Sequence, residues 1–417
     1  MISRLQRFWA AALLTLGLVI LANLGGLEAT PDVENPVELP LEQARILAQR
    51  FSSALIVQAP KAPEFSIPID CSLGEDCFIL LYPDRDPSPD AVDFGCGRQT
   101  YDGHKGTDFA VSDEVVMAQG VPVLAAAPGR VLRVRDGVPD RRLESIEEKA
   151  DVAGQECGNG VVIDHSPISN GLDWETQYCH LRQNSVVVKP GETVERGAVL
   201  GFVGTSGATS FPHVHLSFRY QGQVVDPFVG PDKKSGCQVN RNALWDRSLP
   251  YTPTGLIRAG FSTTAPTMNQ LWEGEFKETT LPIDSPALIF WVQLYGVFQG
   301  DQVAYKLIDP QGRAVVDQQD VLQSSTKTYF QFLGRKNNPQ TPFKPGTWRG
   351  EYRLTRDGEV LVDVEQEVQL VGDGEVSQKK KGAWVMTLLW ILIGLLLFGL
   401  SIPLILGNIP PNHWYGF

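Results

Sequence analysis

Short apolar runs broken by glycine and proline fill the chain from about residue 65 to residue 372. Runs such as "VPVLAAAPGRVLRV" and "NGVVIDH" are bounded by Gly and Pro, which is typical of strands joined by tight turns. No fixed-period repeat accompanies them. The pattern limits the body of the chain to short strands, so we expect a mainly β protein.

The strand-like runs form two groups. Residues 65–240 hold all six cysteines and five of the six histidines, whereas residues 250–372 hold neither residue type. The second group contains runs such as "QVAYKLIDPQG" and "GTWRGEYRLTRDG" at regular intervals, with turn pairs such as Asp357-Gly358 between some of them. This spacing predicts an antiparallel, Ig-like β-sandwich over residues 250–372.

Uncharged apolar segments lie near both ends of the chain. Residues 1–29 join two early arginines to a long run rich in Leu and Ala, which predicts a secretory signal or, alternatively, an uncleaved N-terminal anchor. Residues 382–407 carry no charge and are long enough for a transmembrane helix, with a buried core helix as the alternative. Residues 30–64 are expected to be a linker with a short helix, and residues 373–381 a charged linker.

The charge and the cysteines indicate where the body of the protein works. The net charge is −12, and five basic residues lie at the two ends, so the body of the chain between them is more acidic than the whole. An acidic body argues against sequence-independent binding of nucleic acid, which needs clustered Lys and Arg. An even cysteine count between the two apolar segments predicts disulfides in an exported body, although free buried thiols are the alternative. Cys71 and Cys77 are the easiest local pair, and the count alone leaves fifteen pairings open. We expect an exported, membrane-anchored protein of the cell envelope, in the periplasm or on the outer face of the membrane.

Three short stretches carry the candidate chemistry. In "FPHVHL", His213 and His215 are two residues apart, so a strand would direct both imidazoles to one face. In "GHKGTDFA", His104 and Asp108 are four apart, and the glycines there favour a turn entering a strand over a helix. His180 in "TQYCHL" lies in a third strand-like run.

Zinc chemistry accounts for this set of residues. A catalytic zinc ion takes three protein ligands and keeps one position open for water. His104, Asp108 and one histidine of "HVH" would supply two nitrogens and one oxygen. The remaining imidazoles would serve proton transfer and stabilisation of an oxyanion. The alternative is a scatter of histidines with ordinary structural roles.

The three stretches, taken in order, resemble the LytM/lysostaphin-type zinc metallopeptidases, a family that cleaves peptide cross-links in bacterial cell walls. The resemblance covers residues 96–230, about a third of the chain. It implies that His104, Asp108 and His215 bind Zn²⁺ and that His180 and His213 are the catalytic histidines. It also implies a small, mostly antiparallel β-sheet for the peptidase domain, assigned here to residues 65–240.

A polar stretch at residues 136–158, called the insertion below, departs from the minimal family pattern and is expected to be a loop with a helical turn. The predicted function is a zinc endopeptidase that hydrolyses peptide cross-links of peptidoglycan, with the β-sandwich positioning the enzyme or binding a protein partner. A non-catalytic scaffold that binds peptidoglycan or a partner, and a zinc peptidase that acts on proteins, are the alternatives. His165 is expected to be a turn residue, and His413 is given no role.

Overall fold

The computed structural model describes residues 63–372 apart from residues 146, 170, 172, 232 and 233. The predicted signal at residues 1–29, nearly all of the linker at residues 30–64, the charged linker at residues 373–381 and the transmembrane segment at residues 382–407 lie outside the described residues. These four assignments stay predictions. Within the described ranges, no helix is both long and apolar enough to cross a membrane.

The first part of the described chain, residues 65–251, is called the N-terminal β region. Its main sheet has eight strands, in the order β1-β2-β9-β6-β5-β4-β7 with β10 beside β9, and all of its ladders are antiparallel. The strands are β1 (Cys77–Leu81), β2 (Thr107–Val111), β4 (Gly129–Arg135), β5 (Asn159–Asp164), β6 (Trp174–Leu181), β7 (Thr193–Val194), β9 (His213–Tyr220) and β10 (Gln223–Val225). A separate pair is formed by β3 (Pro122–Leu124) and β8 (Val199–Phe202). The mainly β prediction is confirmed.

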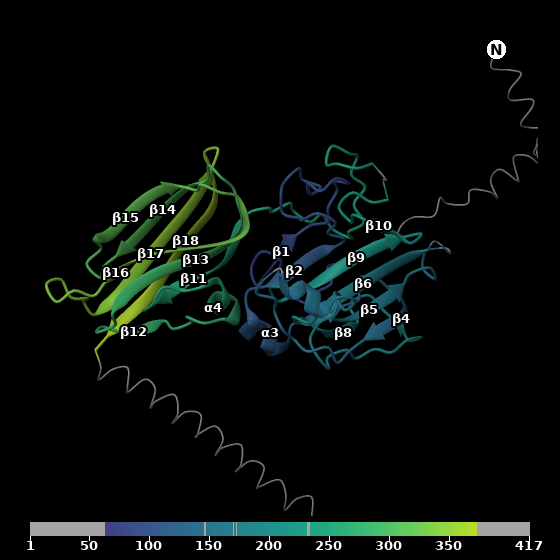
Figure 1. The fold of residues 1–417 in the computed structure, drawn as a ribbon, viewed down its shortest axis with the longest axis horizontal. Coiled ribbons are helices and arrows are strands. Elements are labelled where there is room, and N and C mark those ends of the chain that lie inside the picture. Colours follow the sequence, from purple (N-terminus) through teal and green to yellow (C-terminus); the bar gives the residue numbers. More distant parts are fainter. Residues whose placement is uncertain (1–62, 146, 170, 172, 232–233, 373–417) are drawn as a thin grey trace, which may run out of the picture. The chain divides into compact units, whose positions relative to one another are not determined.

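Strand β9 lies between β2 and β6, as Figure 1 shows. Val214, Leu216 and Phe218 are fully buried in the core of the N-terminal β region. Because side chains alternate along a strand, the histidines at positions 213 and 215 face away from this core. The three strands that the histidine motifs occupy or adjoin are therefore neighbours in one sheet.

Two short helical elements join these strands. Helix α3 (Glu114–Gly120) begins after Asp113, whose side chain accepts a hydrogen bond from the backbone N–H of Val116 and so caps the helix. The 3₁₀ helix η1 (Glu147–Val152) lies within the insertion. The helical turn expected in the insertion is confirmed.

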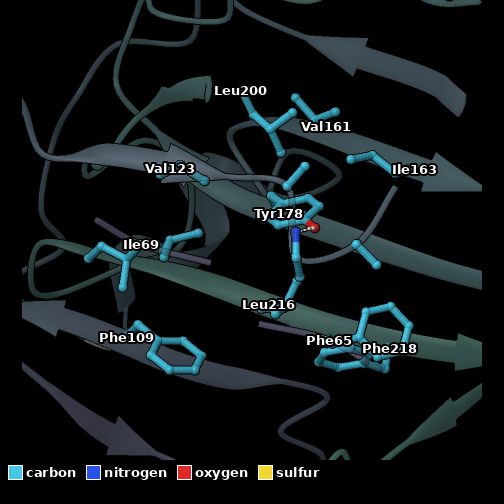
Figure 2. Packing of buried hydrophobic residues seen from close by; sticks show 14 of the residues in the cluster. Phe65, Ile69, Phe109, Val123, Val161, Ile163, Tyr178, Leu200, Leu216 and Phe218 are labelled. Atoms are coloured by element: carbon cyan, nitrogen blue, oxygen red, sulfur yellow. Dashed lines mark hydrogen bonds between the residues drawn. The ribbon is translucent and has the colours of Figure 1, made fainter. Parts of the chain in front are cut away.

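The core of the N-terminal β region is built around Tyr178. Figure 2 shows its ring among Val161, Leu200 and Leu216, all of them fully buried. The Tyr178 hydroxyl accepts a hydrogen bond from the backbone N–H of Ala126 at 2.8 Å. Its single polar atom is thereby satisfied, so the large ring can be buried without an unpaired hydroxyl.

His165 belongs to this core as well as to the turn that was predicted for it. It follows β5 directly and is fully buried. Its Nδ1 donates to the carbonyl of Pro128 at 2.7 Å, and its Nε2 lies 2.8 Å from the Thr176 hydroxyl. Burial lowers the pKa of His165 below its ordinary value of 6.5. The residue therefore has a structural role away from the histidine motifs.

The burial of His165 leads to a prediction about stability and pH. Its pKa is lowered in the folded state, so the unfolded chain binds a proton more readily as the pH falls below about 6.5. The contribution of His165 to the free energy of unfolding is complete above that pH and is lost as the pH falls. We expect the thermal midpoint of the wild type to drop more between about pH 7.5 and about pH 5 than that of His165→Asn, measured by calorimetry. Parallel curves for the two proteins would contradict this account.

The second part, residues 255–371, is called the C-terminal β region. One sheet has the order β11-β13-β16 and the other the order β12-β18-β17-β14-β15. The strands are β11 (Gly255–Ser262), β12 (Thr280–Pro282), β13 (Ala287–Val297), β14 (Gln302–Ile308), β15 (Ala314–Val321), β16 (Thr326–Lys336), β17 (Gly346–Arg356) and β18 (Glu359–Val371), with helix α4 (Met268–Glu273) between β11 and β12. Residues from both sheets share one buried cluster, so this region has a core of its own.

Two details of the C-terminal β region bear on the sequence predictions. Strands β17 and β18 form a hairpin through Asp357 and Gly358, which both have positive φ angles of 51° and 86°, as a tight hairpin turn requires. Strand β12, however, pairs with β18 in parallel. The antiparallel prediction is wrong for this one strand, because helix α4 lies between β11 and β12 and brings the chain back to the edge of the second sheet.

All six cysteines form disulfides, which confirms the prediction of disulfide bonding. The pairs are Cys71–Cys77, Cys96–Cys237 and Cys157–Cys179. The last bond ties the end of the insertion to the residue directly before His180. The three bonds lie in the N-terminal β region, and two of them join a loop to a strand, at Cys77 of β1 and at Cys179 of β6.

Candidate metal centre

The order of the strands brings Asp108 and three histidines together. In the ladder between β2 and β9, Asp108 is the cross-strand partner of His215. On the other side of β9, Cys179 of β6 pairs with His215, and His180 follows Cys179 directly. His213 lies two residues before His215 on the same face of β9. These residues are far apart in sequence and meet because their strands are neighbours.

His104 completes the cluster from the turn before β2. Its Nε2 lies 3.2 Å from Oδ1 of Asp108 and 3.2 Å from Nδ1 of His215, and the last two atoms are 2.7 Å apart. Gly106 makes this approach possible, because a Cβ atom there would lie 2.5 Å from Nε2 of His215. The second glycine of "GHKG" is thus required by the packing of a site residue.

The chemistry of these donor atoms fits a metal ion. Ligand atoms of His104, Asp108 and His215 all lie within 4.8 Å of one another. The carbonyl of Tyr82 accepts a hydrogen bond from Nδ1 of His104 at 2.7 Å, so a neutral His104 presents an unprotonated Nε2 to the cluster. A buried group of electron-pair donors needs a cation or an additional proton between its members. Two nitrogens and one oxygen are a ligand set that catalytic zinc ions take.

The surroundings of Asp108 favour its ionised form. Burial alone would raise the pKa of Asp108, but the facing imidazoles of His104 and His213 outweigh it and hold that pKa well below its usual range. Burial would lower the pKa of His104, yet Asp108 raises it above its ordinary value. Asp108 is 2% exposed to solvent and is held as a carboxylate by the charge and the hydrogen bonds of the neighbouring imidazoles.

His180 and His213 form the other half of the cluster. Their ring centroids are 4.7 Å apart. Nδ1 of His180 donates to the carbonyl of Ser206 at 2.8 Å, and Nδ1 of His213 donates to the carbonyl of Phe211 at 2.9 Å. Burial lowers the pKa of both imidazoles, most strongly for His180. Each neutral ring therefore carries an unprotonated Nε2, and that of His213 lies 3.5 Å from Oδ1 of Asp108.

The backbone of His180 is unusual. Its φ angle is 66°, a left-handed conformation that residues with a Cβ seldom adopt. The backbone N–H of His180 donates to the carbonyl of Cys157 at 2.8 Å, and the Cys157–Cys179 disulfide lies beside it. These bonds hold the histidine in a conformation that costs free energy, as is common at functional sites.

Comparison with known protein families agrees with the geometry. The family described as peptidase family M23 matches residues 102–227, a segment that contains all five predicted site residues. This segment is an M23 peptidase domain. The resemblance inferred from the three motifs is thereby confirmed.

Curated relatives match the same part of the chain. The M23 domain is 32% identical over 126 residues to an uncharacterized metalloprotease of Haemophilus influenzae, in a match that covers 30% of this chain and 20% of the relative. It is 36% identical over 124 residues to the DD-carboxypeptidase/endopeptidase Mpg of Neisseria meningitidis, covering 30% and 22%. It is 30% identical over 123 residues to the peptidoglycan DD-endopeptidase ShyB of Vibrio cholerae, again covering 30% and 22%. The chain thus spans about a fifth of the length of each of these relatives.

One residue of the M23 domain that contacts the candidate metal centre was missed in the sequence. The hydroxyl of Ser217 lies 2.9 Å from Nε2 of His215, on the side of the ring away from Asp108. Such a partner orients a ligand histidine. Ser217 follows His215 by two residues on the same strand, so the alternation of the strand already placed it on the face of the histidines.

The insertion borders the candidate metal centre of the M23 domain. The backbone N–H of Leu143 donates to the carbonyl of Thr209 at 2.7 Å, and the Thr209 hydroxyl lies 3.1 Å from Nδ1 of His213. At its other end, Nζ of Lys149 lies 5.7 Å from the centre of the Tyr101 ring, which packs against His104 at 4.5 Å. The insertion therefore contacts Thr209, which lies beside His213, and Tyr101, which lies beside His104.

The structure brings all five predicted site residues of the M23 domain into one cluster. His104, Asp108 and His215 form one group of ligand atoms, and His180, His213 and His215 form another. His165 lies outside both groups, and His413 lies outside the described residues. The particular role of each residue remains a prediction.

Proposed function

We propose that this protein is a zinc-dependent endopeptidase that hydrolyses peptide cross-links of bacterial peptidoglycan. The observation that carries the proposal is the cluster itself, in which three ligand atoms and two further imidazoles converge within an M23 domain. Relatives named as peptidoglycan DD-endopeptidases support the choice of substrate. The disulfides support a location outside the cytoplasm.

His104, Asp108 and His215 are the residues that would hold the zinc ion. A bound zinc ion would lower the pKa of a coordinated water and polarise the carbonyl of the scissile peptide bond. His104 is fixed for this role by the carbonyl of Tyr82, and His215 by the hydroxyl of Ser217. Asp108 supplies the negative charge that favours a divalent cation in a buried site.

His180 and His213 act on the proton and on the developing charge. Both rings donate Nδ1–H to a backbone carbonyl, so each offers Nε2 to the site. One imidazole would accept the proton from the attacking water, and the protonated ring would donate a hydrogen bond to the oxyanion or to the leaving amine. The lowered pKa of each ring keeps it neutral before the reaction.

The remaining parts of the chain are assigned to export, membrane attachment and positioning of the enzyme. We propose that the protein is exported and held at the membrane by residues 382–407, which lie outside the described residues. The C-terminal β region, an Ig-like sandwich in this proposal, would position the enzyme or bind a protein partner. Nucleic acid is not expected as a partner, because the body of the chain is acidic.

The proposal is tested by offering two substrates to the zinc-loaded chain. We expect release of soluble fragments from purified peptidoglycan sacculi and little cleavage of a denatured protein, with Asp108→Asn as the inactive control. Cleavage of the denatured protein alone would favour a peptidase that acts on proteins. Stoichiometric zinc binding without cleavage of either substrate would favour a non-catalytic scaffold.

A further inference from the structure

Phe211 holds His213 in two ways. Its ring stacks on the imidazole with centroids 4.3 Å apart and planes inclined by 27°. Its carbonyl accepts the Nδ1–H hydrogen bond of the same imidazole at 2.9 Å. A displacement of Phe211 would therefore move both the stacking partner and the hydrogen-bond acceptor that orient His213.

Phe211 is in turn packed by a residue of the C-terminal β region. The ring of Trp272, on helix α4, stacks on Phe211 with centroids 5.7 Å apart and planes inclined by 29°. Trp272 is 3% exposed to solvent. Both rings belong to one buried apolar cluster that also includes Ala110, the cross-strand partner of His213. The cluster is therefore linked to His213 by Phe211, two residues earlier in the chain, and by Ala110, its partner across the ladder.

Ion pairs that each have one buried partner hold helix α4 in this place. Arg142 of the insertion lies 2.7 Å from Glu114 of α3 and 3.6 Å from Glu273 of α4, and its side chain is 5% exposed. Asp113, which caps α3, lies 3.0 Å from Arg258 and 3.0 Å from Lys277. Arg142 and Asp113 are the buried partners, whereas the side chains of Glu273 and Lys277 are 43% and 42% exposed, so these pairs orient the helix and are partly screened by solvent.

The helix also has well-defined ends. Thr267 and Gln270 form a capping box at its start, and Gly274 ends it in a left-handed conformation with a φ angle of 84°. A Cβ atom at Gly274 would lie 2.6 Å from the Val115 side chain of α3. The two helices thus pack closely, and α4 offers Trp272 as a firm support.

We propose that Trp272 is a positioning residue for His213 and acts through Phe211. The C-terminal β region then sets the geometry of the catalytic cluster without contributing a group that touches substrate. Close packing transmits this effect, because a cavity left by Trp272 would allow Phe211 to tilt and the imidazole to turn with it. The inference rests on the proposed function in one respect, namely that His213 is catalytic.

The kinetic test uses variants of the full chain. Trp272→Ala is expected to keep stoichiometric zinc and an unchanged KM for soluble cross-linked peptidoglycan fragments, while kcat falls between about 10-fold and about 100-fold, as misplacement of a reacting group does. Trp272→Phe should recover most of kcat, because an aromatic ring still supports Phe211. Trp272→Leu is expected to behave as the alanine variant does and replaces it if that protein does not fold.

A matched control separates positioning from loss of stability. Trp348 is buried in the core of the C-terminal β region and packs on Phe343 with centroids 5.5 Å apart. Trp348→Ala should lower the thermal midpoint as much as Trp272→Ala does but leave kcat at the wild-type value. If both variants lose kcat in proportion to their loss of stability, Trp272 has only a structural role and the inference is wrong.

A spectroscopic readout does not depend on turnover. In metal-free protein labelled with ¹⁵N-histidine, His213 should show one tautomer with the proton on Nδ1, its signals identified by their loss in His213→Ala. Trp272→Ala or Trp272→Leu should give averaged or shifted signals, and Trp348→Ala should give those of the wild type. Unchanged His213 signals in both Trp272 variants would overturn the inference. A wild type that cleaves no substrate would instead reject the proposed function and leave this readout decisive.

Discussion

Replacement of His215 with alanine is expected to remove zinc from the protein and to abolish hydrolysis. The variant loses one of three ligand atoms that lie within 4.8 Å of one another, and it also removes the partner of the Ser217 hydroxyl. The fall in zinc affinity should exceed the roughly 10- to 100-fold that loss of a supporting hydrogen bond costs. His104→Ala should behave in the same way, because His104 contributes the second nitrogen.

The measurement is zinc content by atomic emission on folded samples whose disulfides are intact. His165→Asn is the matched control, since it changes a buried histidine that lies outside the cluster, and it should keep stoichiometric zinc. Stoichiometric zinc in His215→Ala with unchanged affinity would show that the ligand assignment is wrong.

Replacement of His213 with alanine should have the opposite combination of effects. Zinc should stay near one ion per chain, because His213 is not assigned as a ligand, while turnover falls by about 10²- to 10⁴-fold, as is typical of a lost general acid or base. His180→Ala should match it, since its ring is held in the same way by a backbone carbonyl.

Zinc content and peptide hydrolysis are measured on the same preparations of both variants. If His213→Ala loses zinc while His215→Ala keeps it, the two roles are reversed. If His213→Ala and His180→Ala both keep full activity, neither imidazole takes part in the reaction and the mechanism proposed for the cluster is wrong.

The parts of the site that the sequence could predict are those governed by the period of a strand. The spacing of His213 and His215 placed both on one face of β9, and the glycines around His104 predicted a turn before β2. The structure has both features. Ser217 could have been included by the same alternation. The sandwich-like pattern of the C-terminal β region was likewise visible in its turn pairs, of which Asp357-Gly358 is one.

Other features depend on contacts between residues that no local pattern links. Cys96 and Cys237 are 141 positions apart, so the cysteine count could not pair them. The parallel pairing of β12 follows from the course of the chain after α4. Trp272 and Phe211 are apolar residues in different β regions, and such residues pack without a motif. The sequence placed every candidate ligand before residue 240 and gave no sign that α4 supports one of the histidines.

The most direct test of the central claim is mass spectrometry of the fragments that the zinc-loaded chain releases from purified sacculi. The account predicts that cross-linked fragments are converted to monomers by hydrolysis of one kind of peptide bond, that a chelator stops the reaction and that added zinc restores it. His215→Ala and Asp108→Asn should release no such monomers. Sacculi that keep all their cross-links in the presence of folded, zinc-loaded wild-type protein would contradict the account.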